Sequence, residues 1–422
     1  MPIWEEWSLF QGDVFPRLRN LSIINCRRLI GDLPNHLLAL EFLHIKGCPN
    51  LVSSLSRSPA IHRISIKYCE SHKLAQHPEL EELSRSVRSL DIEGCYPVKS
   101  MFEAMAMYNS HFTTCLVNLS ISSCSFAISF PGGFLPTSLK TLKISHCMKF
   151  EFPSTMNHNQ YCHVLLESLK ITESCESLTS LRMDAFPNLK TLHIEGCENF
   201  ASFSVCKGPL QQLDEVNIRN CVNFTSFAKE GLPAPCLSIL NVSGCNNLKS
   251  LPNKMHSLLP KLKSLLIDDC SEIESFPQGV LPSNLSSLEI RNCDKLVDHR
   301  MNWNLPASLS KLLIYGKCEN VESFPEEGLL PSSLTYLSLT QFSSLQKLDD
   351  KGMQNLISLE QFDIANCPSL ESLTEEKLPA SLIKLTIKEC HLLEEGIHMK
   401  KVEIWPKIAH IRVICVADKI IT

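Results

Sequence analysis

The chain has 422 residues, of which 44% are hydrophobic and 20% charged, and its formal net charge is −5. This length exceeds what one compact core usually supports, so several domains or a repeat architecture are expected. The sequence is slightly acidic, with a pI near 6.3, so it lacks the excess of basic residues that is typical of nucleic-acid-binding proteins. No apolar run approaches the roughly 18 residues of a membrane span. The opening MPIWEEWSLF has acids where a signal peptide needs a basic start and an apolar core, so we expect a cytoplasmic protein.

A short apolar motif recurs along the chain in the form L-x-x-L-x-I-x-x-C-x-x-L. Seventeen copies, about 24 residues apart, begin at Leu18, Leu40, Ile61, Val87, Leu116, Leu139, Leu166, Leu189, Leu213, Leu237, Leu262, Leu285, Leu309, Leu334, Leu359, Leu382 and Ile408. This spacing is the leucine-rich-repeat pattern. It predicts a mostly β solenoid of the α/β type, a curved horseshoe of about seventeen repeats with a parallel concave sheet and irregular convex returns.

Each copy predicts one short strand, because its apolar residues alternate. Leu142 and Ile144 are expected to point inward, while Thr141, Lys143 and Ser145 point outward on the concave side. A single strand cannot bury its apolar side alone, so stacked copies share one continuous core. We predict a lead-in segment at 1–17, a solenoid at 18–416 and a tail at 417–422.

A cysteine occupies the position that follows the predicted strand in most copies. These ladder cysteines are Cys26, Cys48, Cys69, Cys95, Cys124, Cys147, Cys175, Cys197, Cys221, Cys245, Cys270, Cys293, Cys318, Cys367 and Cys390. One extra residue precedes Cys175 and Cys318, and Phe342 and Val416 take the place in the remaining two copies. Because each copy needs the same thiol and an odd row cannot pair completely, we expect buried, reduced, structural cysteines rather than disulfides.

The segments between the predicted strands are rich in proline and glycine. A recurring motif reads FPGGFLPTSL at 130–139, FPQGVLPSNL at 276–285 and FPEEGLLPSSL at 324–334. A shorter form, LPASL, ends at Leu309 and again at Leu382. Such composition is incompatible with long helices, so we predict extended or short 3₁₀ returns. MFEAMAM at 101–107 is the best candidate for a helical turn.

No sequence motif argues for an enzyme. The chain contains neither a G-x-x-x-x-G-K-[ST] phosphate loop nor a G-x-S-x-G nucleophile elbow. HNQYCH at 158–163 offers two histidines and a cysteine, but a metal site needs a fourth ligand and a closed geometry, so we interpret it as a polar loop. We predict no catalytic residues, no metal and no cofactor.

The outward strand positions predict which residues bind a protein partner, because a solenoid binds its partners with the concave strands. An early group combines basic and aromatic side chains and is expected to face an acidic surface. A later group carries large side chains where small polar ones are usual, which suggests an interface anchor. The early group is Phe42, His44, Lys46, Arg63 and Lys67; the later group is Leu266, Arg291, Lys311, Leu313, Tyr315 and Tyr336.

The cysteine ladder, the FPxxGLPxSL returns, the opening MPIWEEW and the closing WPKIAHIRVI together resemble plant intracellular immune receptors. More narrowly, the chain is similar to the C-terminal repeat region of coiled-coil, nucleotide-binding disease-resistance proteins. The resemblance implies a domain that senses pathogen effectors, directly or through a guarded host protein, and restrains a nucleotide switch. The coiled coil and the switch that such receptors carry ahead of the repeats are not in this sequence, so nucleotide-driven signalling is not implied for it.

Two other classes remain as alternatives. A substrate-recognition arm of a ubiquitin ligase also uses cysteine-ladder repeats, but usually with a steadier period and helical returns. An extracellular receptor domain would need a signal peptide, paired capping cysteines and a membrane span, which the sequence does not show.

Overall fold

The computed structural model describes residues 5, 15–30, 33, 37–51, 58–69, 86–94, 115–130, 134–152, 162–206, 208–277, 281–399 and 404–421. The chain divides into two compact units. The N-terminal unit comprises residues 1–200 and 204–212, and the C-terminal unit comprises residues 201–203 and 213–422. Cys95 and the helix expected at 101–107 lie outside the described residues.

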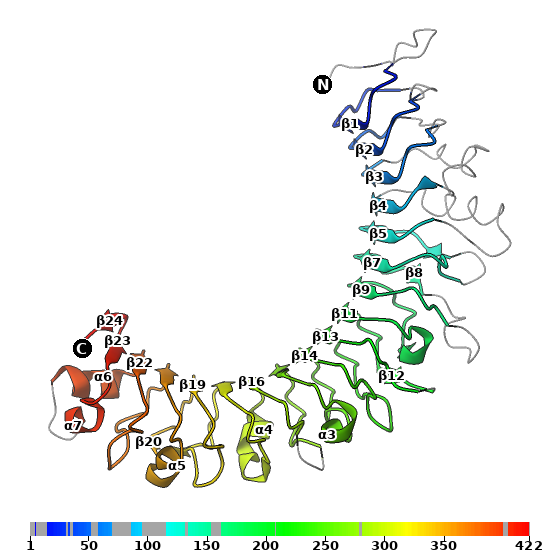
Figure 1. Ribbon diagram of the computed structural model, residues 1–422. Coiled ribbons are helices and arrows are strands. Elements are labelled where there is room, and N and C mark those ends of the chain that lie inside the picture. Colours follow the sequence, from blue (N-terminus) through cyan, green and yellow to red (C-terminus); the bar gives the residue numbers. More distant parts are fainter. Residues whose placement is uncertain are drawn as a thin grey trace. The chain divides into compact units, whose positions relative to one another are not determined.

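The N-terminal unit is a stack of coils that contributes eight parallel strands to one sheet (Figure 1). They are β1 (Asn20–Ile24), β2 (Phe42–Lys46), β3 (Arg63–Lys67), β4 (Ser89–Glu93), β5 (Asn118–Ser122), β7 (Thr141–Ser145), β9 (Ser168–Thr172) and β11 (Thr191–Glu195). Each strand pairs with the next in the same register, so equivalent residues of successive copies lie side by side.

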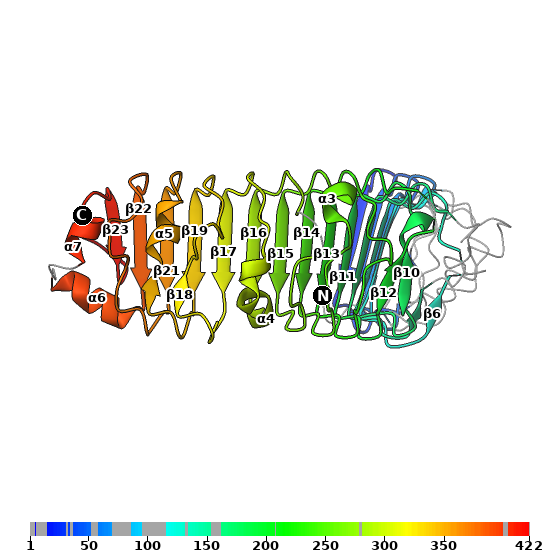
Figure 2. The ribbon, with the colours of Figure 1, turned by 90° about the horizontal axis from the view of Figure 1, so that it is seen from below.

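The C-terminal unit is built in the same way from nine parallel strands, seen side by side in Figure 2. They are β13 (Glu215–Arg219), β14 (Ile239–Ser243), β15 (Ser264–Asp268), β16 (Ser287–Arg291), β17 (Lys311–Tyr315), β19 (Tyr336–Thr340), β21 (Gln361–Ala365), β22 (Lys384–Lys388) and β23 (Val413–Val416). Two residues of the expected tail form β24 (Lys419–Ile420), which pairs antiparallel with β23. Eight strands and nine strands correspond to the seventeen copies of the motif, so the solenoid prediction is confirmed.

The strands form where the sequence alternates because every coil after the first buries its two inward strand residues; in β1 only Ile23 is buried and Leu21 is half-buried. Leu142 and Ile144 of β7, and Leu312 and Ile314 of β17, are at most 1% exposed. Burying two such side chains contributes about 3–6 kcal/mol per coil. The outward residues between them stay partly exposed, so the sheet has one apolar and one solvated side.

The last copy is the one whose register was predicted wrongly. β23 pairs Ile387 with Val416, so the copy begins at Ile411 rather than at Ile408. The Ile411 amide donates to the Ile408 carbonyl, which ends helix α7 (Trp405–Ile408). Val416 therefore occupies an inward strand position and not the ladder position. The error has a physical cause: Ile408, Ile411 and Ile414 recur every three residues, so the sequence fits two registers equally well.

After every strand of the parallel sheet except β17, the chain turns through one residue in the left-handed conformation. Directly after the strands from β1 to β22, fifteen residues have φ between +46° and +66°, and Ala417 after β23 has φ +47°. Nine of them are Gly, Asn or Asp, the residue types that adopt this conformation at least cost. They are Asn25, Gly47, Tyr68, Gly94, Ser123, His146, Glu173, Gly196, Asn220, Gly244, Asp269, Asn292, Gln341, Asn366 and Glu389.

The ladder cysteine follows this turn and closes it. In twelve coils its thiol donates to the carbonyl of the last strand residue, with Sγ–O distances of 3.0 to 3.6 Å. Fourteen ladder cysteines are buried, and all nineteen described cysteines are free thiols. After β9 the same bond is made by Ser174, whose hydroxyl donates to the Thr172 carbonyl at 2.7 Å and accepts from the Cys147 amide at 2.9 Å. The extra residue before Cys175 thus takes over its contact.

The recurring LPxSL phrase is a turn that returns the chain to the sheet. The Leu309 amide donates to the Pro306 carbonyl at 3.0 Å, and the Ser308 hydroxyl donates to the Leu285 carbonyl of the preceding coil at 2.7 Å. The same pair of bonds recurs before β7, β19 and β22. Proline presets the turn, and serine links neighbouring coils.

The returns contain short elements on the side away from the sheet (Figure 1). The 3₁₀ helices are η4 (Met183–Ala185) and η5 (Arg300–Asn302), and the short strands are β6 (Ile128–Ser129), β8 (Phe150–Glu151), β10 (Ser180–Arg182), β12 (Ser202–Ser204), β18 (Ser323–Phe324) and β20 (Lys347–Leu348). The α-helices are α3 (Met255–Leu258), α4 (Asp294–Asp298), α5 (Asp350–Gln354), α6 (His391–His398) and α7. Short α-helices were not predicted; α4 and α6 begin directly after Cys293 and Cys390, where no proline intervenes. No helix among the described residues is long and apolar enough to cross a membrane.

Candidate binding surface

The outward residues of the parallel strands form what we call the sheet face. In the described strands, positions one, three and five are half-buried or exposed with few exceptions, among them Ser65, Ser145 and Asn217, which are buried. All eleven predicted binding residues lie at these positions. The early group lies on β2 and β3 of the N-terminal unit, and the later group on β15, β16, β17 and β19 of the C-terminal unit.

Side chains of the early group contact one another across β2 and β3. The Phe42 and His44 rings stack with their centroids 6.2 Å apart. The Arg63 guanidinium lies 5.1 Å from the centre of the Phe42 ring, within cation–π range. Lys46 and Arg63 are exposed, so their charges are available at the surface.

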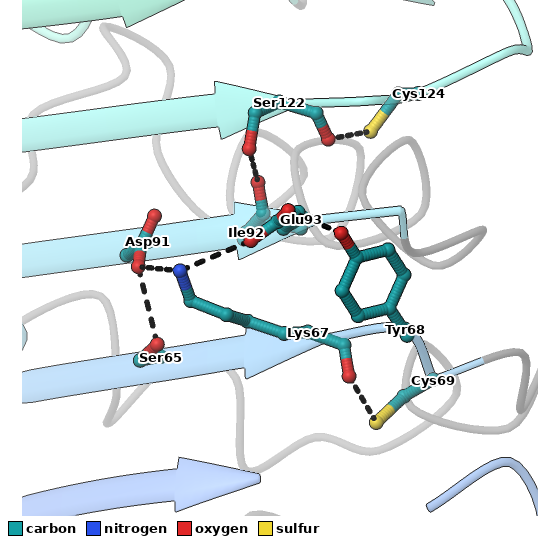
Figure 3. Close-up of polar contacts among 9 residues, drawn as sticks. All are labelled: Ser65, Lys67, Tyr68, Cys69, Asp91, Ile92, Glu93, Ser122 and Cys124. Carbon is teal, nitrogen blue, oxygen red and sulfur yellow. Dashed lines mark hydrogen bonds and ion pairs between the residues drawn. The ribbon is translucent and has the colours of Figure 1, made fainter. Parts of the chain in front are cut away.

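Lys67 belongs instead to a polar network with the next strand (Figure 3). Its ammonium lies 3.1 Å from both the Asp91 and the Glu93 carboxylates of β4. The Ser65 hydroxyl donates to Asp91 at 3.2 Å, and the Tyr68 hydroxyl donates to Glu93. Burial lowers the pKa of Lys67, but its contacts with the two carboxylates outweigh that effect and raise the pKa.

Asp91 and Glu93 were not predicted as members of this surface, although both occupy outward positions of the fourth copy. The hydrogen bonds from Tyr68 and then Lys67 lower the pKa of Glu93, so this carboxylate stays ionised. Because two acids balance Lys67, the positive charge of the early group is carried by Lys46 and Arg63. The in-register strands could have revealed this, since Lys67 and Glu93 hold equivalent positions in consecutive copies.

The later group is organised around Tyr336. Its hydroxyl donates to Asp363 of β21 at 2.7 Å, and the Lys311 ammonium of β17 lies 5.3 Å from the centre of its ring. Burial and then the bond to Asp363 raise the pKa of Tyr336 to about 12, so the phenol remains protonated at neutral pH. Tyr336 is therefore fixed in place as a rigid aromatic surface.

The remaining members of the later group differ in how they are held. Leu313 and Tyr315 lie on β17 and are half-buried, and the structure records no hydrogen bond of the Tyr315 hydroxyl within the described residues. The Arg291 Nε donates to Glu289 of its own strand at 2.6 Å, which neutralises its charge. Leu266 of β15 lies beside Glu289 in the register. The apolar surface thus centres on β17, not on β15.

Burial shields several of the ladder thiols from solution chemistry. Burial raises the pKa of Cys175, Cys197 and Cys293, and it raises the pKa of Cys318 to about 12. Thiolates are the reactive and metal-binding form, so these thiols are poor nucleophiles and poor ligands.

The histidine of HNQYCH that the structure describes is part of the core. His163 is 4% exposed; its Nε2 lies 2.7 Å from the Pro136 carbonyl and its Nδ1 accepts from the Leu166 amide at 3.2 Å. Both ring nitrogens are thereby occupied, and burial lowers the pKa of His163. Residues 158–161 lie outside the described residues, and within the described ranges no group of three or more His, Cys, Asp or Glu residues is placed to hold a metal ion.

Comparisons with known proteins relate the chain to plant disease-resistance proteins. No protein-family model matches the chain. A protein of Arabidopsis thaliana named for disease resistance, At3g14460, is 36% identical over 349 residues, covering 76% of this chain and 22% of that protein. A second Arabidopsis protein, disease resistance RPP13-like protein 1, is 25% identical over 164 residues, covering 37% of this chain and 13% of that protein.

This chain is a leucine-rich-repeat protein related to plant disease-resistance proteins. It spans about a fifth or less of the length of these relatives. Solved leucine-rich-repeat structures include the circular protein CroV588, with 13% identity, 86% and 60% of the two chains covered and a TM-score of 0.43. YopM of Yersinia enterocolitica has 17% identity, 88% and 80% coverage and a TM-score of 0.40.

Proposed function

We propose that this leucine-rich-repeat chain is the protein-recognition region of a plant immune receptor. It would sense a pathogen effector, directly or through a guarded host protein, and act in the cytoplasm. The relatives named for disease resistance support this function over the ubiquitin-ligase alternative, because neither name refers to a ligase. In this proposal the chain acts through a binding surface.

The observation that carries the proposal is the half-buried apolar and aromatic surface on β17 and β19. Leu313 and Tyr315 lie where most other strands carry polar or charged residues, and Tyr336 is fixed beside them by Asp363. Rigid aromatic residues at the centre of an interface typically account for most of the binding free energy. We therefore assign the primary partner contact to this surface.

The early group has a separate role in this proposal. Lys46 and Arg63 are exposed cations without a carboxylate partner in the described part of the chain. They would contact an acidic surface, which in a receptor with a nucleotide switch ahead of the repeats would be that switch domain. Restraint of the switch would then depend on these two charges.

The test is a pairwise binding screen of the chain against secreted pathogen effectors and host immune proteins, with every positive pair measured again with variants. Leu313→Lys combined with Tyr315→Ala should weaken binding by about 2 kcal/mol, a factor of about thirty. Ile357→Lys is the matched control, because Ile357 is 71% exposed but lies outside the sheet strands. Partners that bind the double variant as tightly as the natural chain would refute the assignment of this surface.

A further inference from the structure

Two lysines lie side by side on the sheet face of the N-terminal unit. Lys143 of β7 and Lys170 of β9 are direct partners in the parallel register, and both point outward. Neighbouring strands are about 4.8 Å apart, and like charges placed opposite each other destabilise a sheet. The fold therefore retains a repulsive pair at its surface.

No acid compensates this pair. The structure records no ion pair of Lys143 or Lys170 with any described residue. Nearby lysines behave differently: Lys140 and Lys190 lie 3.1 and 2.7 Å from the Glu167 carboxylate. The pair also differs from Lys67, which two carboxylates of the next strand neutralise.

The surroundings of the pair are polar. In the register, Ser120 of β5 precedes Lys143, and His193 of β11 follows Lys170. His193 is already engaged, because its Nε2 lies 2.9 Å from the Glu195 carboxylate. Hydroxyl-bearing residues flank the row on both sides, among them Thr141 and Thr172, although the Thr172 hydroxyl oxygen is itself buried. Such a surface offers hydrogen bonds and two free positive charges but no apolar anchor.

We propose that Lys143 and Lys170 form a docking site for an extended acidic segment of a partner protein. This inference rests on the proposed function and names the chemistry of one partner segment. Carboxylates two residues apart on an extended chain lie about 7 Å apart on one side, which two flexible lysine side chains on adjacent strands can reach. A small anion would instead need donors that converge on one point, and the backbone amides of these strands are used in the parallel ladder.

The test uses a fluorescently labelled peptide of alternating glutamate and serine and measures its binding to the whole chain by anisotropy. Lys143→Gln combined with Lys170→Gln should weaken binding about tenfold. Lys140→Gln combined with Lys190→Gln is the matched control: it removes the same charge close to the same strands and should change the affinity by less than about twofold. A peptide with glutamine in place of glutamate should not bind.

Each other outcome overturns the inference. Equal losses of affinity in the two double variants would mean that only the net charge of the chain matters. If the peptide does not bind the natural chain, the proposed docking site does not exist. Displacement by millimolar inorganic phosphate would assign the lysines to a small anion. Relief of repulsion predicts an unchanged or higher melting temperature for the Lys143 and Lys170 variant, and a lower one would show a structural role. The proposed function is tested separately, because its variants lie on β17.

Discussion

Replacing Gly352 by alanine should destabilise the C-terminal unit, although alanine favours helices. Gly352 lies in α5, where its amide donates to the N-cap Asp349 at 2.8 Å. A β-carbon built on it would lie 1.8 Å from the Pro325 carbonyl oxygen of the preceding coil and 2.7 Å from the Pro325 carbonyl carbon. Because these are backbone atoms, a side-chain rotation cannot relieve the overlap.

The expected magnitude follows from two opposing effects. Alanine in a helix is favoured over glycine by about 1 kcal/mol. Overpacking against a rigid neighbour costs about 1–3 kcal/mol or more, and an overlap of this size puts the cost at the upper end. We therefore expect a net loss of about 2 kcal/mol in the free energy of unfolding.

The assay is urea denaturation followed by tryptophan fluorescence, since Trp303 is buried in the same unit. Gly328→Ala is the control: Gly328 has φ +75°, but nothing lies within 4 Å of a β-carbon there. It should lose only the left-handed strain of about 1 kcal/mol. A Gly352→Ala chain as stable as the natural one would show that α5 can shift freely, which would refute the reasoning.

Three further predictions concern stability. Cys270→Ala should lower the free energy of unfolding by about 1–2 kcal/mol, because it removes a fully buried sulfur and its hydrogen bond to the Asp268 carbonyl. Cys270→Ser should lose less, because its hydroxyl can donate to the same carbonyl, as Ser174 does in its own coil. Urea midpoints that rank the two variants the other way would contradict this prediction. Because the pKa of His163 is lower in the folded chain, its contribution to stability is complete above about pH 6.5, the pKa of the unfolded chain. That stability is lost as the pH falls from there through the lower pKa of the folded chain. Between pH 7.5 and pH 5, the melting temperature of His163→Gln should therefore fall less than that of the natural chain. Glu326→Gln should lower the free energy of unfolding by about 3 kcal/mol. The Arg300 guanidinium is buried and contacts both Glu326 carboxylate oxygens, so the substitution leaves it without a counter-charge. A change below about 1 kcal/mol in urea denaturation would refute this prediction.

Much of the candidate surface could be predicted from the sequence, because the strand period is two and the copies stack in register. The outward positions of residues such as Phe42 and Tyr315 followed from their offset alone. What each outward side chain contacts did not follow. Lys67 was predicted as a binding cation, but β4 places Asp91 and Glu93 beside it. The pairing of Lys143 with Lys170 was not predicted, because the two residues belong to different copies.

The sequence by itself determined the coil, since an apolar pair, a turn residue that tolerates positive φ and a small buried donor recur at fixed offsets. These are local requirements, and each copy meets them with its own residues. Only the tertiary structure decided the register of the last copy, where Ile408, Ile411 and Ile414 offer equivalent choices and pairing with β22 selects one. Only the structure decided which charges are neutralised, because salt bridges form between residues about 25 positions apart that stacking brings within hydrogen-bond distance.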